Sequence, residues 1–355
     1  QIRRLRASCW GINQCVPKLA SNFATTLELA FIMIRHILSG MAVLATLCLC
    51  SASFANDSTF GEDNGTIVFK QQADISMDKE VLLISEKQVK VDYVFTNHSA
   101  QTLTLPVAFP MPQERFGDMF YDRITQFRLW VNGQRQSTTQ RMVVLLNGKT
   151  DVTQQIYDLG WTLDDLRYYL GQDEPVLGWR PKRGKPLPLA WRGEPPYDPK
   201  LTIHEYFTWQ QTFPAGQSVA ISHAYKPSLY TSVPYTARST IETWQKPACL
   251  DAEARTAIHR LERHIDRRTD PDHTPTILWS ALSYILTTGN HWRGPIKDFT
   301  LILKKELPSD LISLCLDGKF TATDPLTLTL HEQNFVPKAN LDVLFVRRDR
   351  YMKSR

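Results

Sequence analysis

The sequence lacks the short motifs that mark many catalytic and cofactor sites. The residues after position 55 contain no glycine-rich phosphate loop, no Gly-x-Ser-x-Gly nucleophile elbow and no Cys-x-x-Cys pair. Their absence argues against a P-loop nucleotidase, an α/β-hydrolase and a thioredoxin-like redox protein. By motif, the sequence predicts no catalytic residue, no cofactor and no metal site.

The histidines also lack the spacing of joint metal ligands. His259 and His264 fall on one predicted helix, where a spacing of five residues turns them about 140° apart. His204 and His331 are each followed by a glutamate within a predicted strand, where neighbouring side chains face opposite sides of the sheet. Four aspartates could meet after folding, but solvated carboxylates are the simpler interpretation: Asp118, Asp122, Asp164 and Asp165.

Apolar runs are short, and one of them has the features of a secretory signal. The run Ile37–Cys50 has about 14 residues, against the roughly 20 that a membrane-spanning helix requires. A short polar stretch precedes it, and Ser53–Ala55 supplies small residues where a signal peptidase needs them. We therefore predict a signal peptide over residues 33–55, cleaved after Ala55, and a periplasmic or secreted protein that meets the membrane only as its uncleaved precursor.

Other interpretations of this leader stay open. An uncleaved leader would act as a membrane anchor. A lipoprotein would be attached through Cys48 or Cys50, although each follows a leucine where a lipid-transfer site has a small residue. Residues 1–32 show no amphipathic or globular pattern, and we interpret them as translation from upstream of the natural start.

Net charge is small once the leader is set aside. Five of the 41 basic residues and one of the 36 acidic residues precede Asn56, which leaves a formal charge of +1. A nucleic-acid-binding protein requires a strongly basic face. The composition therefore argues against a nucleic-acid partner.

Cysteine is scarce after the leader. Four of the six cysteines precede Asn56, which leaves only Cys249 and Cys315. An even pair in an exported protein suggests a disulfide bond. Such a bond would close a loop of about 66 residues. In the chain-entropy model, it would stabilise the fold by roughly 4 kcal/mol.

Short strands dominate the pattern that follows Thr66. Alternating apolar residues predict strands over Val89–Phe95 and Leu103–Val107, joined by a turn at Asn97–Ala100. Asn-Gly pairs at 132–133 and 147–148 indicate tight hairpins. We expect further strands at 67–69, 81–84, 124–131, 141–146, 203–213, 218–225, 296–304, 311–316, 326–330 and 341–346. The pattern predicts a mainly β protein with inserted helices (α+β), an antiparallel β-sandwich built as one unit or as two packed sub-domains.

Helical periodicity interrupts the strands. Apolar spacing over Thr150–Leu170, broken at Gly160, predicts two short helices. Leu250–Arg268 predicts a charged helix with a narrow apolar stripe. Thr276–Thr288 predicts a more apolar helix that ends with Gly289 as a left-handed cap.

These patterns divide the rest of the chain into four parts. An N-terminal β-sandwich part covers 56–147, and a helical insert with a Pro-, Gly- and Trp-rich loop covers 148–200. A C-terminal β part with two helices and the disulfide covers 201–346. A basic tail covers 347–355.

Two aromatic-bearing segments are the candidate binding surfaces. Trp179 and Trp191 lie in the 171–199 loop, and long loops of this kind are often functional. The corner after the predicted apolar helix could form a pocket in which a tryptophan stacks on a sugar or an apolar chain. Its residues are Thr287, Asn290, His291, Trp292 and Arg293. A structural role explains both segments as well, because the tryptophans would pin the loop and plug the end of the sandwich.

A set of longer motifs runs through the chain: Asp74-Ile75-Ser76-Met77, Phe109-Pro110-Met111-Pro112, Trp209–Gly216, Tyr225-Lys226-Pro227-Ser228, Tyr284–Ile296, Phe335-Val336-Pro337 and Leu341–Phe345. Together they resemble the exported bacterial family catalogued as domain of unknown function 4424, over nearly all of residues 56–346. The resemblance implies a Gram-negative periplasmic or secreted protein and supports pairing of Cys249 with Cys315. It implies no activity and no catalytic residue. Leu316-Asp317 departs from the glycine expected after Cys315.

These features favour a non-catalytic binding or scaffolding protein for an envelope protein or glycan. The alternative is an envelope hydrolase whose carboxylates meet His223 or His291 through folding. Two acids and a histidine within about 3 to 8 Å in a concave site would favour the hydrolase. A subunit of an envelope assembly would instead show a large uncovered apolar patch.

We expect protein purified from the periplasm to have the mass of residues 56–355, lower by two hydrogen atoms than after reduction. Intact mass spectrometry with and without a reductant measures both quantities. A mass that retains the leader, or one that reduction leaves unchanged, would contradict the prediction.

Overall fold

The computed structural model describes residues 58–63, 66–111, 124–170, 180–191, 200–263 and 277–349. The predictions for the leader, for Trp179 and for the end of the basic tail lie outside these ranges. Residues Ser53–Arg355 form one compact unit.

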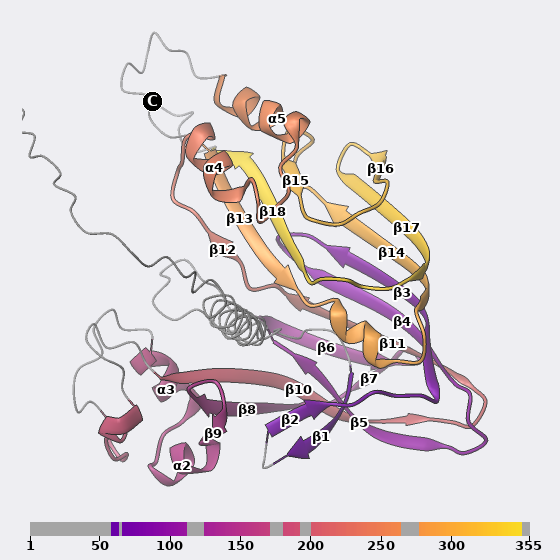
Figure 1. The fold of residues 1–355 in the computed structure, drawn as a ribbon, viewed down its shortest axis with the longest axis vertical. Helices are drawn as coiled ribbons and strands as arrows, with labels where there is room; N and C mark the ends of the chain where they lie inside the picture. The colour runs from indigo at the N-terminus through magenta and orange to yellow at the C-terminus, as the bar shows by residue number, and fades with distance from the viewer. Residues whose placement is uncertain are drawn as a thin grey trace, which may run out of the picture. The chain divides into compact units, whose positions relative to one another are not determined.

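Strands of the described ranges form three sheets (Figure 1). The six-stranded sheet has the order β2 (Thr66–Phe69), β1 (Ser58–Asp63), β5 (Leu103–Pro110), β10 (Leu201–Phe213), β8 (Thr139–Leu146) and β9 (Thr150–Asp151). The eight-stranded sheet has the order β16 (Thr321–Asp324), β17 (Thr327–Phe335), β14 (Ile296–Lys304), β3 (Ile75–Ile84), β4 (Val89–Asn97), β11 (Ser218–Lys226), β6 (Thr125–Val131) and β7 (Gln134–Gln136). The four-stranded sheet has the order β12 (Tyr230–Thr231), β13 (Ile277–Tyr284), β18 (Leu341–Arg348) and β15 (Leu311–Ser313).

Short helices connect and cover these sheets. They are α2 (Thr153–Asp158), α3 (Leu163–Leu170), η1 (Leu189–Trp191), α4 (Ala237–Trp244), α5 (Ala252–Arg263) and η2 (Thr287–His291). No helix in the described part of the chain is long and apolar enough to cross a membrane. The prediction of a mainly β fold with inserted helices is confirmed.

The main hydrophobic core joins all three sheets. In β4, every second side chain from Val89 to Phe95 is buried, and the residues between them face outward. The same core contains Tyr284 of β13, Val343 of β18 and Phe213 of β10. Each such side chain, when fully buried, stabilises the fold by about 1.5 to 3 kcal/mol.

A buried asparagine holds the corner between the eight-stranded and six-stranded sheets. The Asn97 amide group donates to the carbonyl oxygens of Gln101 and Phe213, both at 2.9 Å. The Asn97 side-chain oxygen accepts the backbone N–H of Ser99 at 2.9 Å. The turn predicted at Asn97–Ala100 is thus the point where the chain passes from β4 to β5.

The helix predicted over Thr276–Thr288 is wrong, because this segment forms β13. One face of β13 carries Trp279, which packs against α4, and the other carries Tyr284, which enters the main core. A strand buried on both faces is apolar nearly throughout, so its periodicity resembles that of a buried helix. Gly289 lies inside η2 and does not adopt the left-handed conformation of a cap.

The two short helices predicted in the 148–200 insert are confirmed as α2 and α3. Gly160 separates them with a φ of +78°. Thr162 and Asp165 form the predicted cap: the Thr162 N–H donates to the Asp165 carboxylate at 2.9 Å, and the Asp165 N–H donates to the Thr162 hydroxyl at 3.1 Å. Apolar residues of this insert pack on β8 and β10 as a second cluster.

The C-terminal part contains α4 and α5, and α5 confirms the predicted charged helix over Ala252–Arg263, where the described residues end. Asp251 caps α5 by accepting the Ala254 N–H at 2.7 Å. Sequence reasoning missed α4, although Thr236 begins it with a hydroxyl that accepts the Ser239 N–H at 3.1 Å.

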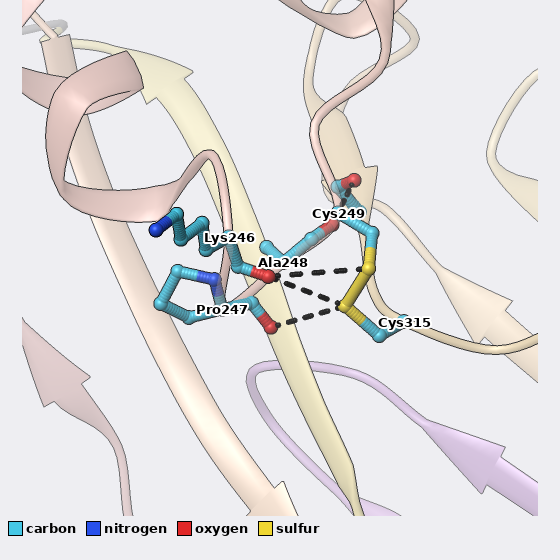
Figure 2. The surroundings of a disulfide bond; sticks show 6 residues. Lys246, Pro247, Ala248, Cys249 and Cys315 are labelled. Carbon is cyan, nitrogen blue, oxygen red and sulfur yellow. Dashed lines mark hydrogen bonds between the residues drawn. A yellow bond between two sulfur atoms is a disulfide. The ribbon is translucent and has the colours of Figure 1, made fainter. Parts of the chain in front are cut away.

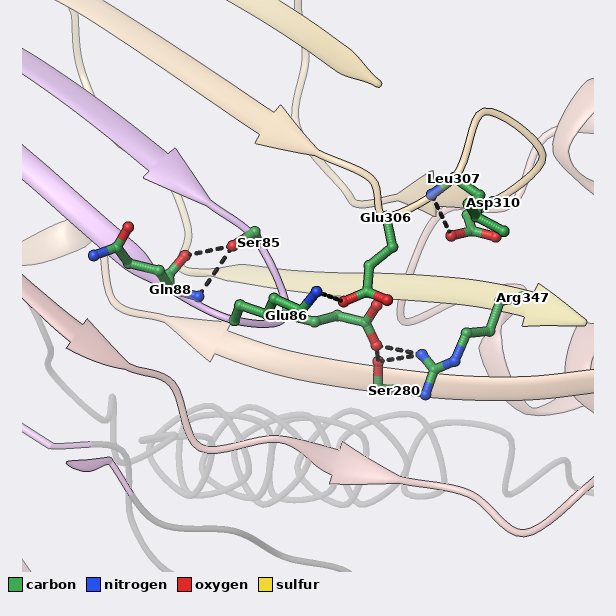
Figure 3. A network of polar contacts seen from close by, with 9 residues as sticks. Ser85, Glu86, Gln88, Ser280, Glu306, Leu307, Asp310 and Arg347 are labelled. Atoms are coloured by element: carbon green, nitrogen blue, oxygen red, sulfur yellow. Dashed lines mark hydrogen bonds and ion pairs between the residues drawn. The ribbon is translucent and has the colours of Figure 1, made fainter. Parts of the chain in front are cut away.

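A polar network joins the β3–β4 turn to the four-stranded sheet (Figure 3). The Glu86 carboxylate accepts the Ser280 hydroxyl of β13 at 2.5 Å and pairs with Arg347 of β18. The Glu86 side chain is only 11% exposed. The pair therefore lies where solvent screens it little.

We expect Glu86→Gln to lower the free energy of unfolding by roughly 2 kcal/mol, because it leaves a half-buried guanidinium without its charged partner. Urea denaturation measures the change. Lys87→Ala is the matched control, since it removes the exposed Lys87–Glu306 pair next in the chain, for which we expect less than about 1 kcal/mol. Equal effects of the two substitutions would contradict the prediction.

Candidate functional site

The corner at 287–293 uses its polar side chains within the protein. The Thr287 hydroxyl donates to Asn340 at 2.9 Å, and the Asn290 amide donates to the Pro337 carbonyl at 2.8 Å. His291 Nδ1 lies 3.2 Å from the Ser58 hydroxyl, and burial lowers the pKa of this histidine. Arg293 remains exposed. These contacts join η2 to β1 and to the loop before β18.

Trp292 lies in the main core and is 1% exposed. Its ring centroid is 4.6 Å from that of Phe95 and 6.1 Å from that of Phe213. A buried ring cannot stack on a ligand at the surface, so these contacts favour the structural role of Trp292 over the binding role. Trp191 lies in η1 and packs against the cluster of the helical insert, while Trp179 lies outside the described residues.

Cys249 and Cys315 form the expected disulfide, with their Cα atoms 5.1 Å apart (Figure 2). The bond ties the turn between α4 and α5 to the segment after β15. The Cys315 sulfur lies 3.5 Å from the carbonyl oxygens of both Lys246 and Pro247. A disulfide sulfur has no proton to donate, so these are packing contacts.

The two histidines proposed for a hydrolase have different surroundings, His223 among aromatic rings and His291 beside Ser58. His223 is 0% exposed, and its ring centroid lies 4.8 Å from that of Phe109 and 5.6 Å from that of Tyr93. His291 contacts Ser58, as described above. Within the described ranges, no group of three or more His, Cys, Asp or Glu side chains could hold a metal ion.

The fold does bring a serine, a histidine and an aspartate together, in an order that does not suit catalysis. The Ser76 hydroxyl donates to Asp78 at 2.6 Å and lies 2.7 Å from His98 Nε2. In a catalytic triad the histidine takes the serine proton. Here that proton already goes to Asp78, so His98 acts as the donor.

Asp78 instead links three strands of the sheet. Burial alone would raise the pKa of its carboxyl, but hydrogen bonds from Lys297, Ser76 and Thr96 outweigh that effect and lower it. The Lys297 ammonium lies 2.6 Å from the carboxylate. The cluster therefore fastens β3 to β4 and β14, which is a structural role.

The outer edge of β8 beside α2 is a better candidate, and two hydrogen bonds show how its backbone is oriented. The Val144 N–H donates to the Thr153 hydroxyl at 2.8 Å, and the Val144 carbonyl accepts the Val152 N–H at 2.9 Å. Both groups of Val144 thus point away from β10. Because this orientation alternates along a strand, the N–H and C=O groups of Met142 and Gln140 point to the same outer edge.

The neighbouring strand gives an independent check. The Glu205 carbonyl accepts the Met111 N–H at 2.9 Å and so points toward β5. Glu205 is the register partner of Met142. Because the Glu205 backbone is bonded toward β5, it forms no hydrogen bond with the backbone N–H and C=O of Met142. On the outer side, β9 pairs only with Leu145 and Leu146, so among the described strands none pairs with this edge at Met142 or Gln140.

This open edge faces a hollow of about 620 Å³, a size typical of ligand sites. Gln140, Arg141 and Met142 line it from the strand. The opposite wall comes from β9 and α2, through Asp151, Thr153, Gln154, Gln155, Tyr157 and Asp158. Tyr157 is 49% exposed although it is aromatic. The hollow thus combines open backbone groups with amide, carboxylate, guanidinium and phenol side chains.

A buried polar cluster fixes the strand side of the hollow. The Gln140 amide donates to Glu205 at 2.5 Å, and Glu205 pairs with Arg167 of α3. Glu205 is 5% exposed and Arg167 is 10% exposed. Breaking such a buried pair costs about 3 to 5 kcal/mol, so α3 and β10 hold the beginning of β8 firmly in place.

Burial favours the neutral forms of the two titratable side chains of β10 that flank Glu205 in the sequence. Burial raises the pKa of Tyr206 to about 12, and the nearby Arg141 offsets only part of that effect. Burial also lowers the pKa of His204. We therefore expect neither side chain to carry charge at neutral pH.

Sequence reasoning placed this strand and this helix but missed the open edge. A signal was present: the Asn147-Gly148 hairpin is followed by helical spacing from Val152, which leaves room for only a very short return strand. The pairing of β8 with β10, more than fifty residues away, could not be inferred from local pattern.

The chain is similar, at low identity and low TM-score, to several solved structures. A "putative nutrient binding protein" of Legionella pneumophila is 13% identical, with 82% of this chain and 70% of that chain covered, at a TM-score of 0.41. The M1 zinc metallopeptidase of Deinococcus radiodurans is 12% identical, covering 78% and 43%, at 0.26. Yeast LTA4 hydrolase is 8% identical, covering 80% and 31%, at 0.30. Similarities this weak support no conclusion about activity.

The sequence itself gives a firmer assignment. No curated protein matches the chain. A family described as "Domain of unknown function (DUF4424)" matches residues 55–344, which include nearly all the motifs identified above. The chain therefore belongs to the DUF4424 family, as the motifs predicted.

Proposed function

We propose that this protein is a non-catalytic binding protein of the cell envelope that recognises an extended segment of a partner protein. The observation that carries the proposal is the open edge of β8 facing the hollow beside α2. In this mode the partner adds a strand to the six-stranded sheet, next to Gln140 and Met142.

The open backbone groups favour a peptide over other ligands. Two N–H and two C=O groups alternate along the edge at the spacing that an extended chain also has. Unpaired groups of this kind readily accept another strand. The wall formed by α2 lies opposite, so a bound segment would lie between a strand and a helix.

The lining of the hollow gives the expected chemistry of the segment. Gln155 and Asp158 are exposed, and Arg141 lines the strand side. These groups hydrogen-bond polar and charged side chains, while the Tyr157 ring offers an apolar surface with a polar end. We expect a polar segment with at least one aromatic or aliphatic residue.

The remaining parts of the proposal rest on the sequence and on the histidine environments. The signal-like leader and the disulfide support export to the periplasm. The burial of His223 among aromatic rings and the bonding order of Ser76, Asp78 and His98 support a role without catalysis.

The proposal is tested with a photo-crosslinking residue at position 157, expressed in the native envelope. We expect crosslinks to a defined partner at Tyr157 and none at Tyr168, an exposed tyrosine of the same insert that does not line the hollow. A synthetic peptide from the crosslinked region should bind the purified protein in calorimetry.

Two substitutions at position 140 distinguish the contribution of the backbone N–H at the strand edge from that of the Gln140 side chain. Both Gln140→Pro and Gln140→Ala lose the bond to Glu205, but only proline removes the outward N–H. We expect Gln140→Pro to weaken peptide binding about tenfold relative to Gln140→Ala, since one lost hydrogen bond is worth about 1.4 kcal/mol. Equal affinities, or equal crosslinking at 157 and 168, would refute strand addition.

A further inference from the structure

A second hollow, of about 540 Å³, is lined by residues of both the four-stranded and the eight-stranded sheet. The beginning of α5, the turn after β14, β15 and the segment that follows it surround the opening. This region is far along the chain from β8, and it shares no lining residue with the first hollow.

The floor of the second hollow is the end of the main core. Leu303 of β14 is fully buried, and Leu316, Phe320 and Leu328 pack against the core while remaining half-exposed. A ligand gains more binding free energy from apolar side chains in a concave surface than from isolated ones on a convex surface. The reason is that it removes several of them from water at once.

The mouth of this hollow carries an excess of negative charge. Asp251 and Glu253, both exposed, line it, and the buried Asp310 also lines the hollow, against one lysine, Lys305. Asp251 and Asp310 accept backbone N–H groups at 2.7 and 2.9 Å, which hold both side chains in place. The positive end of α5 offsets only about half a unit of this charge. The mouth therefore attracts cations.

The Cys249–Cys315 disulfide fixes one wall. Cys249 lines the hollow, and both cysteines are exposed. Cys249 has a φ of +49°, a conformation that residues with a β-carbon adopt rarely. Besides the disulfide, a hydrogen bond from Ser313 to the Ala248 carbonyl at 2.8 Å holds this turn against β15.

We propose that this hollow is a second binding site, which takes a small amphipathic cation with an aliphatic or aromatic body. The apolar body lies on Leu316, Phe320 and Leu328, and the cationic group lies at the mouth near Asp251 and Glu253. The disulfide holds the α4–α5 turn that forms the wall, so the site is complete only in the oxidised protein.

Calorimetry with octylammonium and octanoate tests the proposal, because the two probes share a chain length and differ in charge. We expect octylammonium to bind at least tenfold more tightly, and added salt to reduce the difference. Equal affinities, or tighter binding of octanoate, would overturn the proposal.

Two alanines of α5 provide a matched pair of variants. Ala257 lines the hollow, whereas Ala252 is exposed on the same helix and does not line it. We expect Ala257→Trp to fill the space and abolish octylammonium binding, and Ala252→Trp to leave it unchanged. Binding that survives Ala257→Trp would place the ligand elsewhere.

Three further measurements test whether a change in octylammonium binding comes from this site and not from misfolding or from the strand-addition site. Glu253→Lys changes an exposed residue, and we expect it to reduce the preference for octylammonium over octanoate. Reduction of the disulfide should weaken octylammonium binding about tenfold while circular dichroism stays unchanged. Gln140→Pro should not affect it. A preference that survives Glu253→Lys, an affinity unchanged by reduction, or a loss in Gln140→Pro would each contradict the assignment.

Discussion

The packing of Trp292 against Phe95 and Phe213 is the contact on which the arrangement of the three sheets depends. The three rings come from the segment after β13, from β4 and from β10, and every pair of centroids lies between 4.6 and 6.1 Å apart. Aromatic pairs of this kind contribute about 0.5 to 1.5 kcal/mol each beyond their burial. They join residues nearly two hundred positions apart, so the early and late parts of the sequence fold around one centre.

Both candidate sites lie where this regular packing stops. At β8, the sheet ends because the chain turns into α2 after a return strand of only two residues. At the second hollow, β15 is also short, with three residues. A strand that ends early leaves either open backbone groups or an uncovered part of the core, and each gap accepts a different ligand. Strand addition requires backbone complementarity, whereas the second hollow requires an apolar body with a positive charge.

Three polar groups of the interior link elements of the fold through their hydrogen bonds and ion pairs. Asp78 joins three strands, Asn97 holds a corner and Glu86 connects two sheets. Each is buried or half-buried with its hydrogen bonds made, as a buried polar group requires. A count of carboxylates and histidines in the sequence does not distinguish such groups from an active site. Their hydrogen-bond partners do.

The sequence alone determined the features that depend on neighbouring residues. The Asn-Gly hairpins at 132–133 and 147–148 have positive φ at all four residues, the alternation of β4 specifies its buried face, and the Thr162–Asp165 cap begins α3. The pairing of the two remaining cysteines also followed from their number. Only the tertiary structure decided that β13 is a strand, that Trp292 is buried and that the edge of β8 is open. The reason is that an apolar segment takes its conformation from whatever covers it, and a strand's edge depends on partners that lie far away in the sequence.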